Sequence, residues 1–469
     1  MNIQKEIKNI LQKKKNKTFI KILSKNINIS YDDFYKNSLQ ISNSLKNNKI
    51  KPGSKIMVQM ENSIDYLYII FACLIGNYTV CPVDTEIKKE KLNKIENILN
   101  PSVKIRNKKD IKYFKKNFVS NIKKKSPFII IFTSGTTGEP KGIQISNSSY
   151  LGSAISYSRL VNYDEDSVIL HFLPMYYNAG ILNTFFSCFF AGSKIILIDK
   201  ISGLNIMNFW ENIRDKNISS FHLTPEIANS LTKINVPFDL KKQIEKIKII
   251  STGSYLHQQI VDKFEQKYNV RILSCYGLTE IGGPLTIQNW ENTFVEGSVG
   301  HHSKEVKVKV KEKGKKDHIY IKSPYLMDCY VGEGKEKIKI NLEKGYFNTG
   351  DIGSYDKGEL IIKGRRKDII KKGAEIVSLP YIENIFMKNK LVDEACGISE
   401  NDIDKGSKIY IFVKLKNSNN IEKSLSRLKT ETSSILKRIE IPDRIIPVPS
   451  LPKTYNGKTK KNILSEIYL

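Results

Sequence analysis

The sequence predicts an α/β protein with a large, multi-layer N-terminal domain and a smaller, mobile α/β C-terminal domain. At 469 residues the chain exceeds one ordinary domain. Apolar runs typical of strands alternate with helix-like segments over most of the chain, as in a layered α/β fold. From about residue 295 short alternating segments replace this pattern, so we expect hairpins there.

The first third of the chain already shows the alternation. A helix is expected over residues 30–48, where Ser30 can cap the start and Asp32 and Asp33 suit the first turn. Residues 103–126 are rich in lysine with little periodicity, so we expect a surface connection there. The segments between these two are a turn and strand at 51–60, a buried helix at 66–76, a strand at 78–83 and a charged helix ending at Ile98.

The middle of the chain contains apolar runs that each end in a turn rich in Gly, Ser, Thr or Pro. Ligand sites in open α/β sheets gather at the carboxyl ends of such strands. We therefore expect the active site at these turns. The runs are FIIIFTSG (128–135), SVILHFLP (167–174), SKIILID (193–199), ISSFHLTP (218–225), KIKIISTGS (246–254) and VRILSCYG (270–277).

Toward the end of the chain the apolar runs become shorter and alternate with polar residues. Three segments are expected to form hairpin strands: VKVKVKEKG (306–314), HIYIKSP (318–324) and KIKINLEKGYF (337–347). The domain boundary is expected near Gly364, after the strand ELIIK. The N-terminal domain would then cover residues 1–363 and the C-terminal domain residues 364–469.

The net charge of +28 has two explanations, nucleic-acid binding or a general composition bias. Only 9 of the 76 basic residues are arginine, the residue that base and phosphate readers favour. The lysines are scattered along the chain. These facts favour composition bias, so we expect no nucleic-acid partner.

Cysteine usage and hydropathy indicate the compartment. The six cysteines form no CxxC pair, which suits a reducing cytoplasm. The first residues lack the apolar core of a signal peptide. The longest apolar stretch, residues 66–83, is interrupted by Gly76, Asn77 and Pro82, so no membrane span is expected.

Residues 131–142, IFTSGTTGEPKG, predict an anion-binding loop after a buried strand. The spacing is neither that of the common nucleotide P-loop nor that of the dinucleotide fingerprint. The glycines still allow backbone N–H groups to approach an anion, and the hydroxyl groups add donors. The alternative is a plain surface turn. The four hydroxyl residues among glycines, directly after a buried strand, favour a loop that binds a triphosphate. The expected contacts are Thr133, Ser134, Gly135, Thr136, Thr137, Gly138 and Lys141.

Together with four further motifs, this loop resembles the signature of the adenylate-forming superfamily. That superfamily contains acyl- and aryl-CoA synthetases, amino-acid-activating adenylation domains and beetle luciferases. The resemblance covers nearly the whole chain. The matching motifs are TSGTTGEPKG (133–142), YGLTE (276–280), TGD (349–351), GRRKD (364–368) and LPKTYNGK (451–458).

The resemblance implies a reaction in two halves. A carboxylate attacks the α-phosphate of ATP to give an acyl-adenylate and pyrophosphate, and a thiol then takes the acyl group. The thiol would be CoA or, alternatively, the phosphopantetheine arm of an acyl carrier protein. Pro380 lies one position later than the usual proline of the hinge region, which leaves the identity of the thiol open. A non-catalytic adenylate-binding relative is disfavoured because the catalytic positions are all matched.

The resemblance also assigns nucleotide contacts. Glu280 would hold Mg²⁺, which prefers oxygen ligands, and Thr279 would contact the α-phosphate. Asp351 would bind the ribose hydroxyls, although an Asx turn is the alternative role for this residue. Arg365 would add a contact to ribose or phosphate. The adenine would lie between Tyr276, with Gly277 beside it, and the backbone of Gly253 and Ser254.

Two lysines of the C-terminal part have implied roles in catalysis and domain movement. Lys458 would bridge the substrate carboxylate and a ribose oxygen during adenylation, in preference to Lys453, Lys460 and Lys461. Lys367 would be the hinge about which the C-terminal domain rotates between the two half-reactions.

The acid pocket is expected to follow the strand that ends near residue 174. Relatives that activate amino acids place an Asp here to pair the substrate ammonium, whereas this chain has Tyr177. An unpaired buried ammonium is costly, so an α-amino acid is disfavoured. A mostly apolar pocket is expected, lined by Tyr176, Tyr177, Ala179, Ile181, Gly282 and Gly283.

Overall fold

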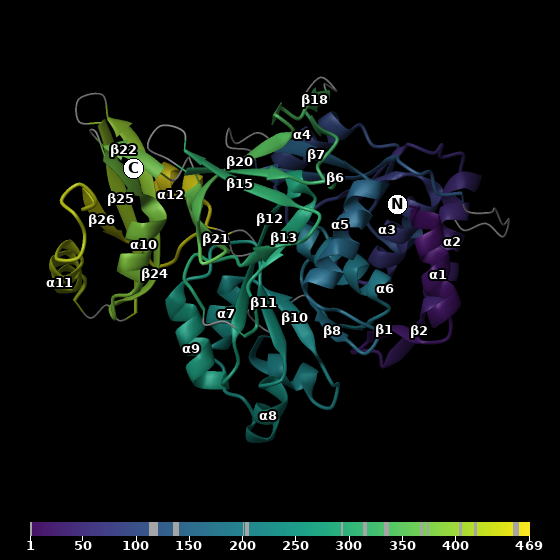
Figure 1. Ribbon diagram of the computed structural model, residues 1–469, viewed down its shortest axis with the longest axis horizontal. Coiled ribbons are helices and arrows are strands. Elements are labelled where there is room, and N and C mark those ends of the chain that lie inside the picture. Colours follow the sequence, from purple (N-terminus) through teal and green to yellow (C-terminus); the bar gives the residue numbers. More distant parts are fainter. Residues whose placement is uncertain are drawn as a thin grey trace.

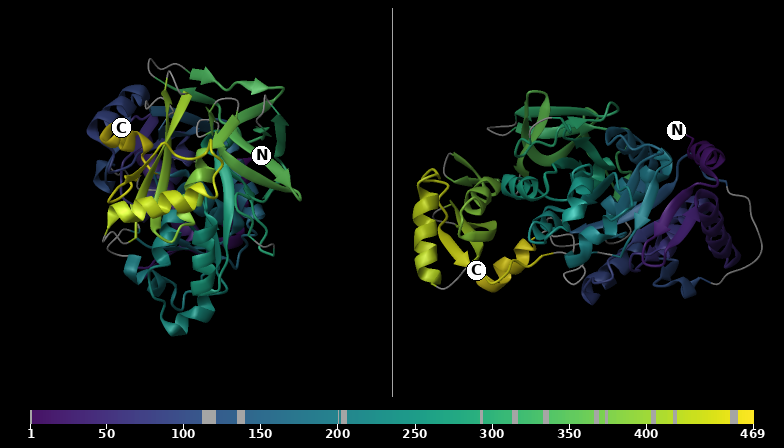
Figure 2. Two further views of the ribbon diagram at one scale, coloured as in Figure 1. Left: turned by 90° about the vertical axis from the view of Figure 1, so that its left-hand side faces the viewer. Right: turned by 90° about the horizontal axis from the view of Figure 1, so that it is seen from below.

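The computed structural model is an α/β protein with a large N-terminal part and a smaller C-terminal part (Figure 1). The C-terminal part lies at the end of the molecule opposite to α1 and α2 (Figure 2). The predicted fold class is therefore confirmed. The structure describes residues 2–111, 121–134, 140–199, 201, 206–291, 294–312, 317–332, 337–365, 369–372, 375–402, 406–416, 420–453 and 459–469.

Nine described strands form the largest sheet, in the order β14-β13-β12-β11-β10-β8-β9-β1-β2. The six strands from β12 to β1 in this order run parallel, so their carboxyl ends share one edge. The strands are β1 (Thr18–Ile22), β2 (Ile27–Ser30), β8 (Val168–His171), β9 (Lys194–Leu197), β10 (Ser220–Leu223), β11 (Lys248–Ser251), β12 (Ile272–Leu278), β13 (Gly283–Ile287) and β14 (His301–His302).

A second large sheet has seven described strands, in the order β18-β17-β7-β6-β4-β3-β5. Strands β5, β3, β4 and β6 are parallel, and β7 and β17 pair antiparallel to their neighbours. The strands are β3 (Lys55–Val58), β4 (Thr79–Pro82), β5 (Val103–Ile105), β6 (Pro127–Ser134), β7 (Pro140–Ser146), β17 (Cys329–Val331) and β18 (Lys337–Lys339).

The main hydrophobic core lies between these two sheets. It joins residues of both sheets to residues of the helices that separate them. Helix α3 is apolar on all sides because it is surrounded by this core, and Ser63 caps its start. The helices of this layer are α1 (Ile3–Lys14), α2 (Tyr31–Asn47), α3 (Ile64–Gly76), α5 (Asn147–Leu160), η2 (Ala179–Phe186) and α6 (Ser187–Ala191).

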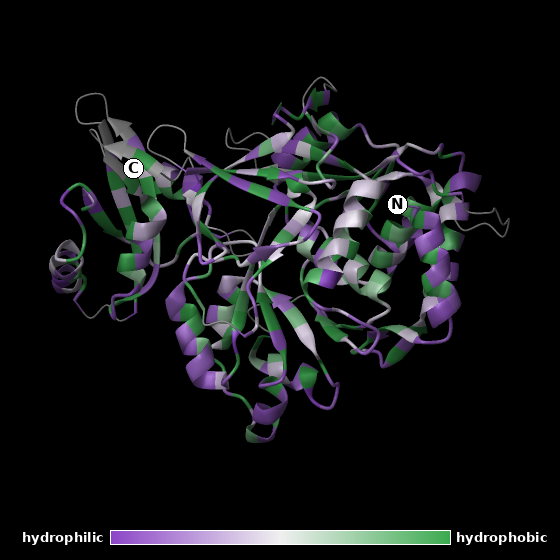
Figure 3. Ribbon diagram, in the orientation of Figure 1, coloured by the Kyte–Doolittle hydropathy of each residue, from purple (hydrophilic) through white to green (hydrophobic). Residues whose placement is uncertain are grey.

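Outer helices cover the other face of each sheet. Helix α4 (Lys89–Leu99) packs Ile95 and Leu99 on the seven-stranded sheet. A second core lies on the far face of the nine-stranded sheet. Figure 3 shows apolar strands inside and polar residues on helices such as α9. The covering helices are η3 (Ile206–Ile213), α7 (Pro225–Leu231), η4 (Phe238–Leu240), α8 (Lys241–Ile244) and α9 (Gln258–Tyr268).

A third sheet follows, with the described strands β15-β16-β20-β19 in order and β21 paired to β20. Of the strands predicted after residue 295, those at 306–314 and 318–324 pair here as β15 and β16, whereas the segment at 337–347 is divided between β18 of the seven-stranded sheet and the β19–β20 hairpin of this sheet. A short helix, η5 (Thr279–Ile281), connects β12 to β13, and η1 (Lys108–Asp110) follows β5. The strands of the third sheet are β15 (Lys307–Glu312), β16 (Asp317–Lys322), β19 (Leu342–Glu343), β20 (Tyr346–Asp356) and β21 (Glu359–Arg365).

The C-terminal part has hydrophobic clusters that contain only residues from Ile370 onward. A separate core of this kind is what a smaller second domain requires. The boundary at residue 364 stays a prediction. The elements are β22 (Ile369–Lys372), β23 (Glu375–Ser378), α10 (Leu379–Met387), β24 (Val392–Asp402), β25 (Gly406–Leu415), α11 (Ile421–Ser433), β26 (Arg444–Pro447) and α12 (Lys461–Tyr468).

Two local expectations have opposite outcomes. The helix predicted over residues 30–48 is α2, and the Ser30 hydroxyl accepts a hydrogen bond from the Asp33 backbone N–H at 3.0 Å. The plain surface connection predicted from residue 103 is wrong at its start, because β5 pairs with β3 there and buries Ile105. In the part of the chain that the structure describes, no helix is both long enough and apolar enough to span a membrane.

Candidate active site

Residues predicted to bind nucleotide and acid gather at the carboxyl edge of the nine-stranded sheet. Tyr177 follows β8, Gly253 follows β11 and Tyr276 lies in β12. The φ angle of Gly253 is +95°, a conformation that suits glycine. A Cβ atom at this position would lie 3.1 Å from the Tyr177 hydroxyl oxygen. The structure thus brings Tyr177 and Gly253 into contact although they are distant in the sequence.

Asp351 is the most deeply buried carboxylate of the predicted site, with 2% of its surface exposed. The Tyr276 hydroxyl donates a hydrogen bond to its Oδ2 atom at 2.5 Å. The Arg365 Nε atom lies 3.3 Å from its Oδ1 atom, because Asp351 and Arg365 pair across β20 and β21. Burial, reinforced by the Asp351 charge, raises the pKa of Tyr276 well above its usual value. Tyr276 therefore stays protonated and donates to the carboxylate.

The backbone conformation of the TGD turn, residues 349–351, is fixed by its own residues. The Thr349 hydroxyl donates to the Ile319 carbonyl at 2.9 Å and accepts from the Asp351 backbone N–H at 3.0 Å. Gly350 has a φ of +74°, which a side chain would disfavour. The threonine and the glycine thus fix the backbone that presents Asp351 to Tyr276 and Arg365.

Glu280 lies in η5, next to Thr279. Burial raises the pKa of its carboxyl, and Arg365 opposes that rise while Asp351 adds to it. Tyr330 in β17 hydrogen-bonds to Glu280, which together with burial raises the pKa of Tyr330 to about 12. Within the described ranges, no group of three or more His, Cys, Asp or Glu side chains could hold a metal ion.

Three glycines shape the turn between β12 and β13. Gly282 and Gly283 have φ angles of +89° and +117°, and a Cβ atom on Gly277 would overlap the Gly283 carbonyl. A Cβ atom on Gly283 would meet Leu182 and lie 3.4 Å from the Asn178 amide nitrogen. The start of β13 is thus packed against the start of η2, where the acid pocket was predicted.

The predicted anion-binding loop follows β6 in the sequence and precedes β7, and these two strands pair up to Ser134 and Pro140. The predicted contacts Thr133 and Ser134 end β6, and Lys141 is an exposed residue near the start of β7. Strand β7 pairs with β17, the strand of Tyr330, so the base of the loop lies one strand from the partner of Glu280. The remaining predicted contacts lie outside the described residues: Gly135, Thr136, Thr137 and Gly138.

The acid segment contains a feature that the sequence analysis missed. Residues Ala179–Phe186 form a π-helix, a rare element that occurs often at functional sites. Just before it, Asn178 accepts a hydrogen bond from the buried Tyr150 hydroxyl at 2.7 Å. Tyr176 and Tyr177, both predicted pocket residues, are partly buried. No periodicity distinguishes a π-helix from an α-helix over eight residues, so the sequence carried no signal for it.

Two C-terminal residues with predicted roles lie outside the described residues: Lys458, predicted to act in catalysis, and Lys367, the predicted hinge. Lys453, five positions before Lys458, lies 2.7 Å from a carboxylate oxygen of Glu394. Burial raises the pKa of Glu226 in α7, and nearby Lys453 opposes that rise. Glu226 in turn lies 3.5 Å from the Ser254 hydroxyl. The segment that leads to Lys458 therefore lies beside a residue of the predicted site.

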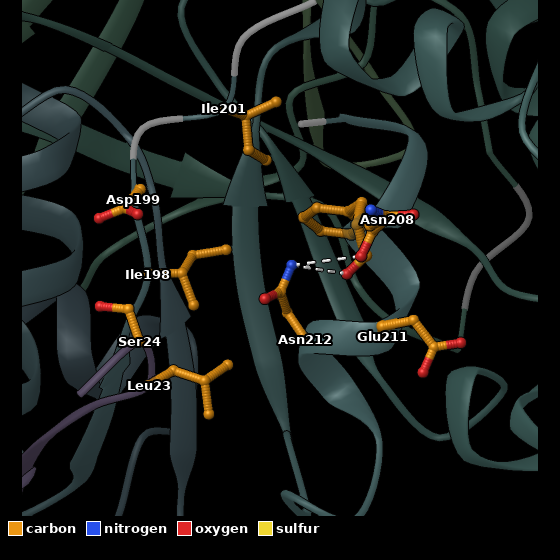
Figure 4. A pocket seen from close by; sticks show the side chains of 9 residues that line it. Leu23, Ser24, Ile198, Asp199, Ile201, Asn208, Glu211 and Asn212 are labelled. Atoms are coloured by element: carbon orange, nitrogen blue, oxygen red, sulfur yellow. Dashed lines mark hydrogen bonds between the residues drawn. The ribbon is translucent and has the colours of Figure 1, made fainter. Parts of the chain in front are cut away.

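A cavity of about 300 Å³ lies elsewhere, at the ends of β1 and β9 (Figure 4). It contains none of the residues predicted to bind substrate. Its lining is Leu23, Ser24, Ile198, Asp199, Ile201, Asn208, Phe209, Glu211 and Asn212. Most of its polar side chains are exposed, so this cavity is not a candidate for the chemistry.

Comparison with known proteins identifies the family. The family described as "AMP-binding enzyme" matches residues 8–331, and "AMP-binding enzyme C-terminal domain" matches residues 381–458. A 2-succinylbenzoate–CoA ligase of Staphylococcus aureus strain Newman is 26% identical over 88% of this chain and 90% of that protein. The corresponding ligase of strain MRSA252 is 30% identical over 71% of this chain and 66% of that protein.

Solved structures show the same fold. ATP-bound MatB from Rhodopseudomonas palustris has a TM-score of 0.88 and 21% identity, covering 100% of this chain and 99% of that chain. The o-succinylbenzoate CoA synthetase MenE from Bacillus subtilis, in complex with AMP, has a TM-score of 0.84 and 18% identity, covering 98% and 97%. This chain therefore belongs to the AMP-binding enzyme family and is an AMP-forming acid–thiol ligase, which activates a carboxylic acid with ATP and transfers the acyl group to a thiol.

Proposed function

We propose that the site at the carboxyl edge of the nine-stranded sheet performs both half-reactions of this ligase, with the residues that the sequence predicted. The observation that carries this proposal is the buried Asp351 carboxylate between Tyr276 and Arg365. A carboxylate can accept about four hydrogen bonds, so these two partners leave room for both ribose hydroxyls. This placement would fix the nucleotide with its phosphates toward Thr279 and the loop after β6.

The first half-reaction brings two anions together. A carboxylate oxygen of the acid attacks the α-phosphorus, the bond to the bridging oxygen breaks, and pyrophosphate leaves. The transition state therefore needs donors and cations that are already in position. Arg365, Thr279 and the N–H groups of the loop after β6 would supply them, and Lys458 would reach the reacting oxygens from the loop that begins beside Glu226.

Magnesium is expected with the triphosphate. Proteins usually hold this ion with one or two carboxylates together with substrate phosphates. Glu280 suits that role because burial raises the pKa of its carboxyl and a cation beside it would favour the ionised form. When bound, the ion would neutralise charge on the departing pyrophosphate.

In the second half-reaction the thiol sulfur attacks the acyl carbonyl and AMP leaves. We expect the C-terminal domain, residues 364–469, to rotate at Lys367 between the two steps. CoA is the thiol that the relatives' names indicate. A carrier protein is the second candidate, because the net charge of +28 would favour an acidic partner. All six cysteines are buried and free, which fits an enzyme that works in the reducing cytoplasm.

The acid would enter between η2 and the glycine turn before β13. On one side of this entrance Gly283 lies against Leu182 and Asn178. On the other side Gly253 lies against Tyr177. The relatives are named for 2-succinylbenzoate, so this aryl keto acid is the first to test.

The test is pyrophosphate release with ATP and Mg²⁺ over a panel of acids, each with and without CoA. The panel contains 2-succinylbenzoate together with fatty, aryl, hydroxy and amino acids. We expect one acid class to be preferred, with turnover that rises when CoA is present. A preferred acid whose turnover ignores CoA would indicate a carrier protein instead. No release with any acid would contradict the proposal.

A further inference from the structure

Lys453 lies where the C-terminal part of the chain meets the N-terminal part, and it has no role in the mechanism above. Its Nζ atom lies 2.7 Å from a carboxylate oxygen of Glu394 in β24. Glu226 of α7 is also close to this ion pair: burial raises the pKa of Glu226, the Lys453 charge opposes that rise and the Glu394 charge adds to it. The lysine is therefore close to carboxylates of both parts of the chain.

The other end of α7 makes a second contact with the C-terminal part. Lys233 follows the end of this helix, and its Nζ atom lies 3.4 Å from Oδ1 of Asp393. The other oxygen of Asp393 accepts a hydrogen bond from Lys414 of β25 at 2.8 Å. Both ends of α7 thus meet neighbouring acidic positions of β24 or the lysine bound there. We call these residues the charged joint: Glu226, Lys233, Asp393, Glu394 and Lys453.

Lys453 also closes the neck of the loop that carries Lys458. Lys453 and Thr459 form an antiparallel β-bridge, and the Lys460 backbone N–H donates to the Pro452 carbonyl at 2.7 Å. Thr459 directly follows Lys458 in the sequence, and adjacent Cα atoms are only about 3.8 Å apart. The place of Lys453 therefore limits where the backbone of Lys458 can lie.

The charged joint brings this neck to the predicted nucleotide site. The Ser254 hydroxyl, next to the predicted adenine contact, lies 3.5 Å from Oε1 of Glu226. Among the described residues, Oε2 of Glu226 is buried without a hydrogen-bond partner. A buried carboxylate of this kind is costly unless positive charge lies near it. Lys453 supplies such a charge from the C-terminal part of the chain.

We propose that Glu226 and Lys453 are positioning residues for adenylation: the charged joint docks the loop of Lys458 at the nucleotide site during the first half-reaction and opens for the second. This role rests on the proposed function, in which Lys458 acts in adenylation. It goes beyond that function because neither residue is predicted to touch the nucleotide or the acid. Both would act through the place they give to the loop.

The exposure of the charged joint suits a positioning role. Isolated ion pairs on a surface contribute little, because water and salt screen them. Here the exposed fractions are 30% for the Lys453 side chain, 20% for Glu394 and 14% for Asp393. Partly buried charges that alternate in sign are screened less and favour one geometry. We therefore expect substitutions here to act on the loop more than on stability.

The first experiment separates the two half-reactions in Lys453→Ala. Pyrophosphate release with the best acid of the panel measures adenylation, and thioester formation from the prepared acyl-adenylate and CoA measures the second step. The kcat of adenylation should fall about tenfold or more, since a small displacement of a catalytic group is costly. The KM for ATP and the rate of thioester formation should not change. An equal fall in both half-reactions would indicate general damage and overturn the inference.

Two conservative variants test the charge itself. Glu226→Gln keeps the size of the side chain and its hydrogen bonds but removes its charge. It should lower adenylation alone and leave the melting temperature unchanged. Lys453→Arg keeps the positive charge and should retain most of the adenylation that Lys453→Ala loses. Unchanged adenylation in Glu226→Gln would overturn the inference.

The matched control is Lys104→Ala. Lys104 of β5 also lies 2.7 Å from a glutamate oxygen, that of Glu96, but both residues belong to the N-terminal part. This variant loses an ion pair of the same kind and length and should leave both half-reactions unchanged. A loss of adenylation as large as in Lys453→Ala would mean that the effect is not specific to the charged joint.

A second measurement needs no turnover. All six native cysteines are buried, so fluorescent labels can be directed to Lys242→Cys in α8 and Ser426→Cys in α11, two exposed positions in the two parts of the chain. With ATP present, Glu226→Lys places like charges at the joint and should change the energy transfer between the labels. Lys104→Ala should not change it. Equal energy transfer in Glu226→Lys and in the wild-type protein would overturn the inference.

Failure of the proposed function looks different. In that case no acid of the panel would release pyrophosphate, or Lys458→Ala would release it at the wild-type rate. The energy-transfer measurement would still show whether the charged joint holds the two parts of the chain together.

Discussion

The two faces of the nine-stranded sheet carry opposite kinds of side chain at the same two strands. On the far face, Leu170 and Phe221 pack into an apolar core, with the Phe221 ring 5.5 Å from that of Phe209. On the near face, the adjacent residues His171 and His222 are equally buried but have unpartnered nitrogens. Neighbouring positions in one strand thus have opposite effects on stability.

This difference indicates that the two faces of the sheet have different roles. The far face gains free energy from burial, and of the residues predicted to bind substrate its core includes Ala179 and has Tyr177 packed against it. The near face holds the histidine pair, whose unpartnered nitrogens are buried at a cost to stability, and the carboxyl edge holds Tyr276, which donates a hydrogen bond to Asp351 of β20. Substitutions on the far face should therefore change stability, and substitutions at the carboxyl edge should change chemistry.

The largest effect is expected on the far face. Phe221→Ala should lower the free energy of unfolding by about 3–5 kcal/mol, because a fully buried ring leaves a cavity. Denaturant unfolding measures this change. Phe238→Ala is the control, since that ring is 87% exposed and its loss should cost less than about 0.5 kcal/mol. Equal losses for both variants would contradict the assignment of the far face to stability.

The next effect tests the chemistry of the edge. Lys458→Ala should slow adenylation by about a hundredfold or more, because a charge that stabilises the transition state is lost. Pyrophosphate release measures the rate, and nucleotide binding should persist. Lys460→Ala, an exposed neighbour, serves as the control. Unchanged pyrophosphate release in Lys458→Ala would remove that residue from its proposed role.

A smaller effect is expected at the ribose site. Tyr276→Phe removes the donor to Asp351 and should weaken ATP binding by about tenfold, near the 1.5 kcal/mol of a hydrogen bond to a charged group. Equilibrium binding of ATP measures it. Tyr268→Phe is the matched control, because its hydroxyl donates to the Ile234 carbonyl at 3.0 Å, away from the site. The same loss of affinity in both variants would argue against the Asp351 contact.

The smallest effect concerns pH. The pKa values of His171 and His222 are about 3 in the folded protein and near 6.5 when unfolded. Below pH 6.5 the unfolded chain binds protons that the folded chain does not, so the free energy of unfolding should fall as pH decreases toward 3. Melting temperatures between pH 7 and 5 should fall less in His171→Phe than in the wild-type protein. An identical fall would indicate that His171 is already protonated or exposed.

The candidate site could be proposed from the sequence because its motifs are local. The TGD turn needs a hydroxyl group and a glycine at fixed spacing, and the structure shows both in the roles that this spacing requires. The anion-binding role of the loop at 131–142 stays a prediction. The strand ends were predictable for a similar reason, since each apolar run stops at a turn. The start of the 103–126 segment was not, because Ile105 is buried only through pairing of β5 with β3.

Other parts of the site depend on contacts between distant segments. A single His in an apolar strand usually indicates a core position, and only the register of β8 against β10 places His171 beside His222. The π-helix differs from an α-helix by hydrogen bonds that neighbouring packing selects rather than by composition.

The sequence by itself determined the family, the fold class and the positions where nucleotide chemistry is expected, because these depend on residue types at short, fixed separations. Only the tertiary structure decided which distant residues meet: Tyr276 with Asp351, Gly253 with Tyr177, and the α5 face with the histidine pair. The physical reason is that such contacts depend on strand register and helix packing, in which many weak interactions along the whole chain are balanced at once.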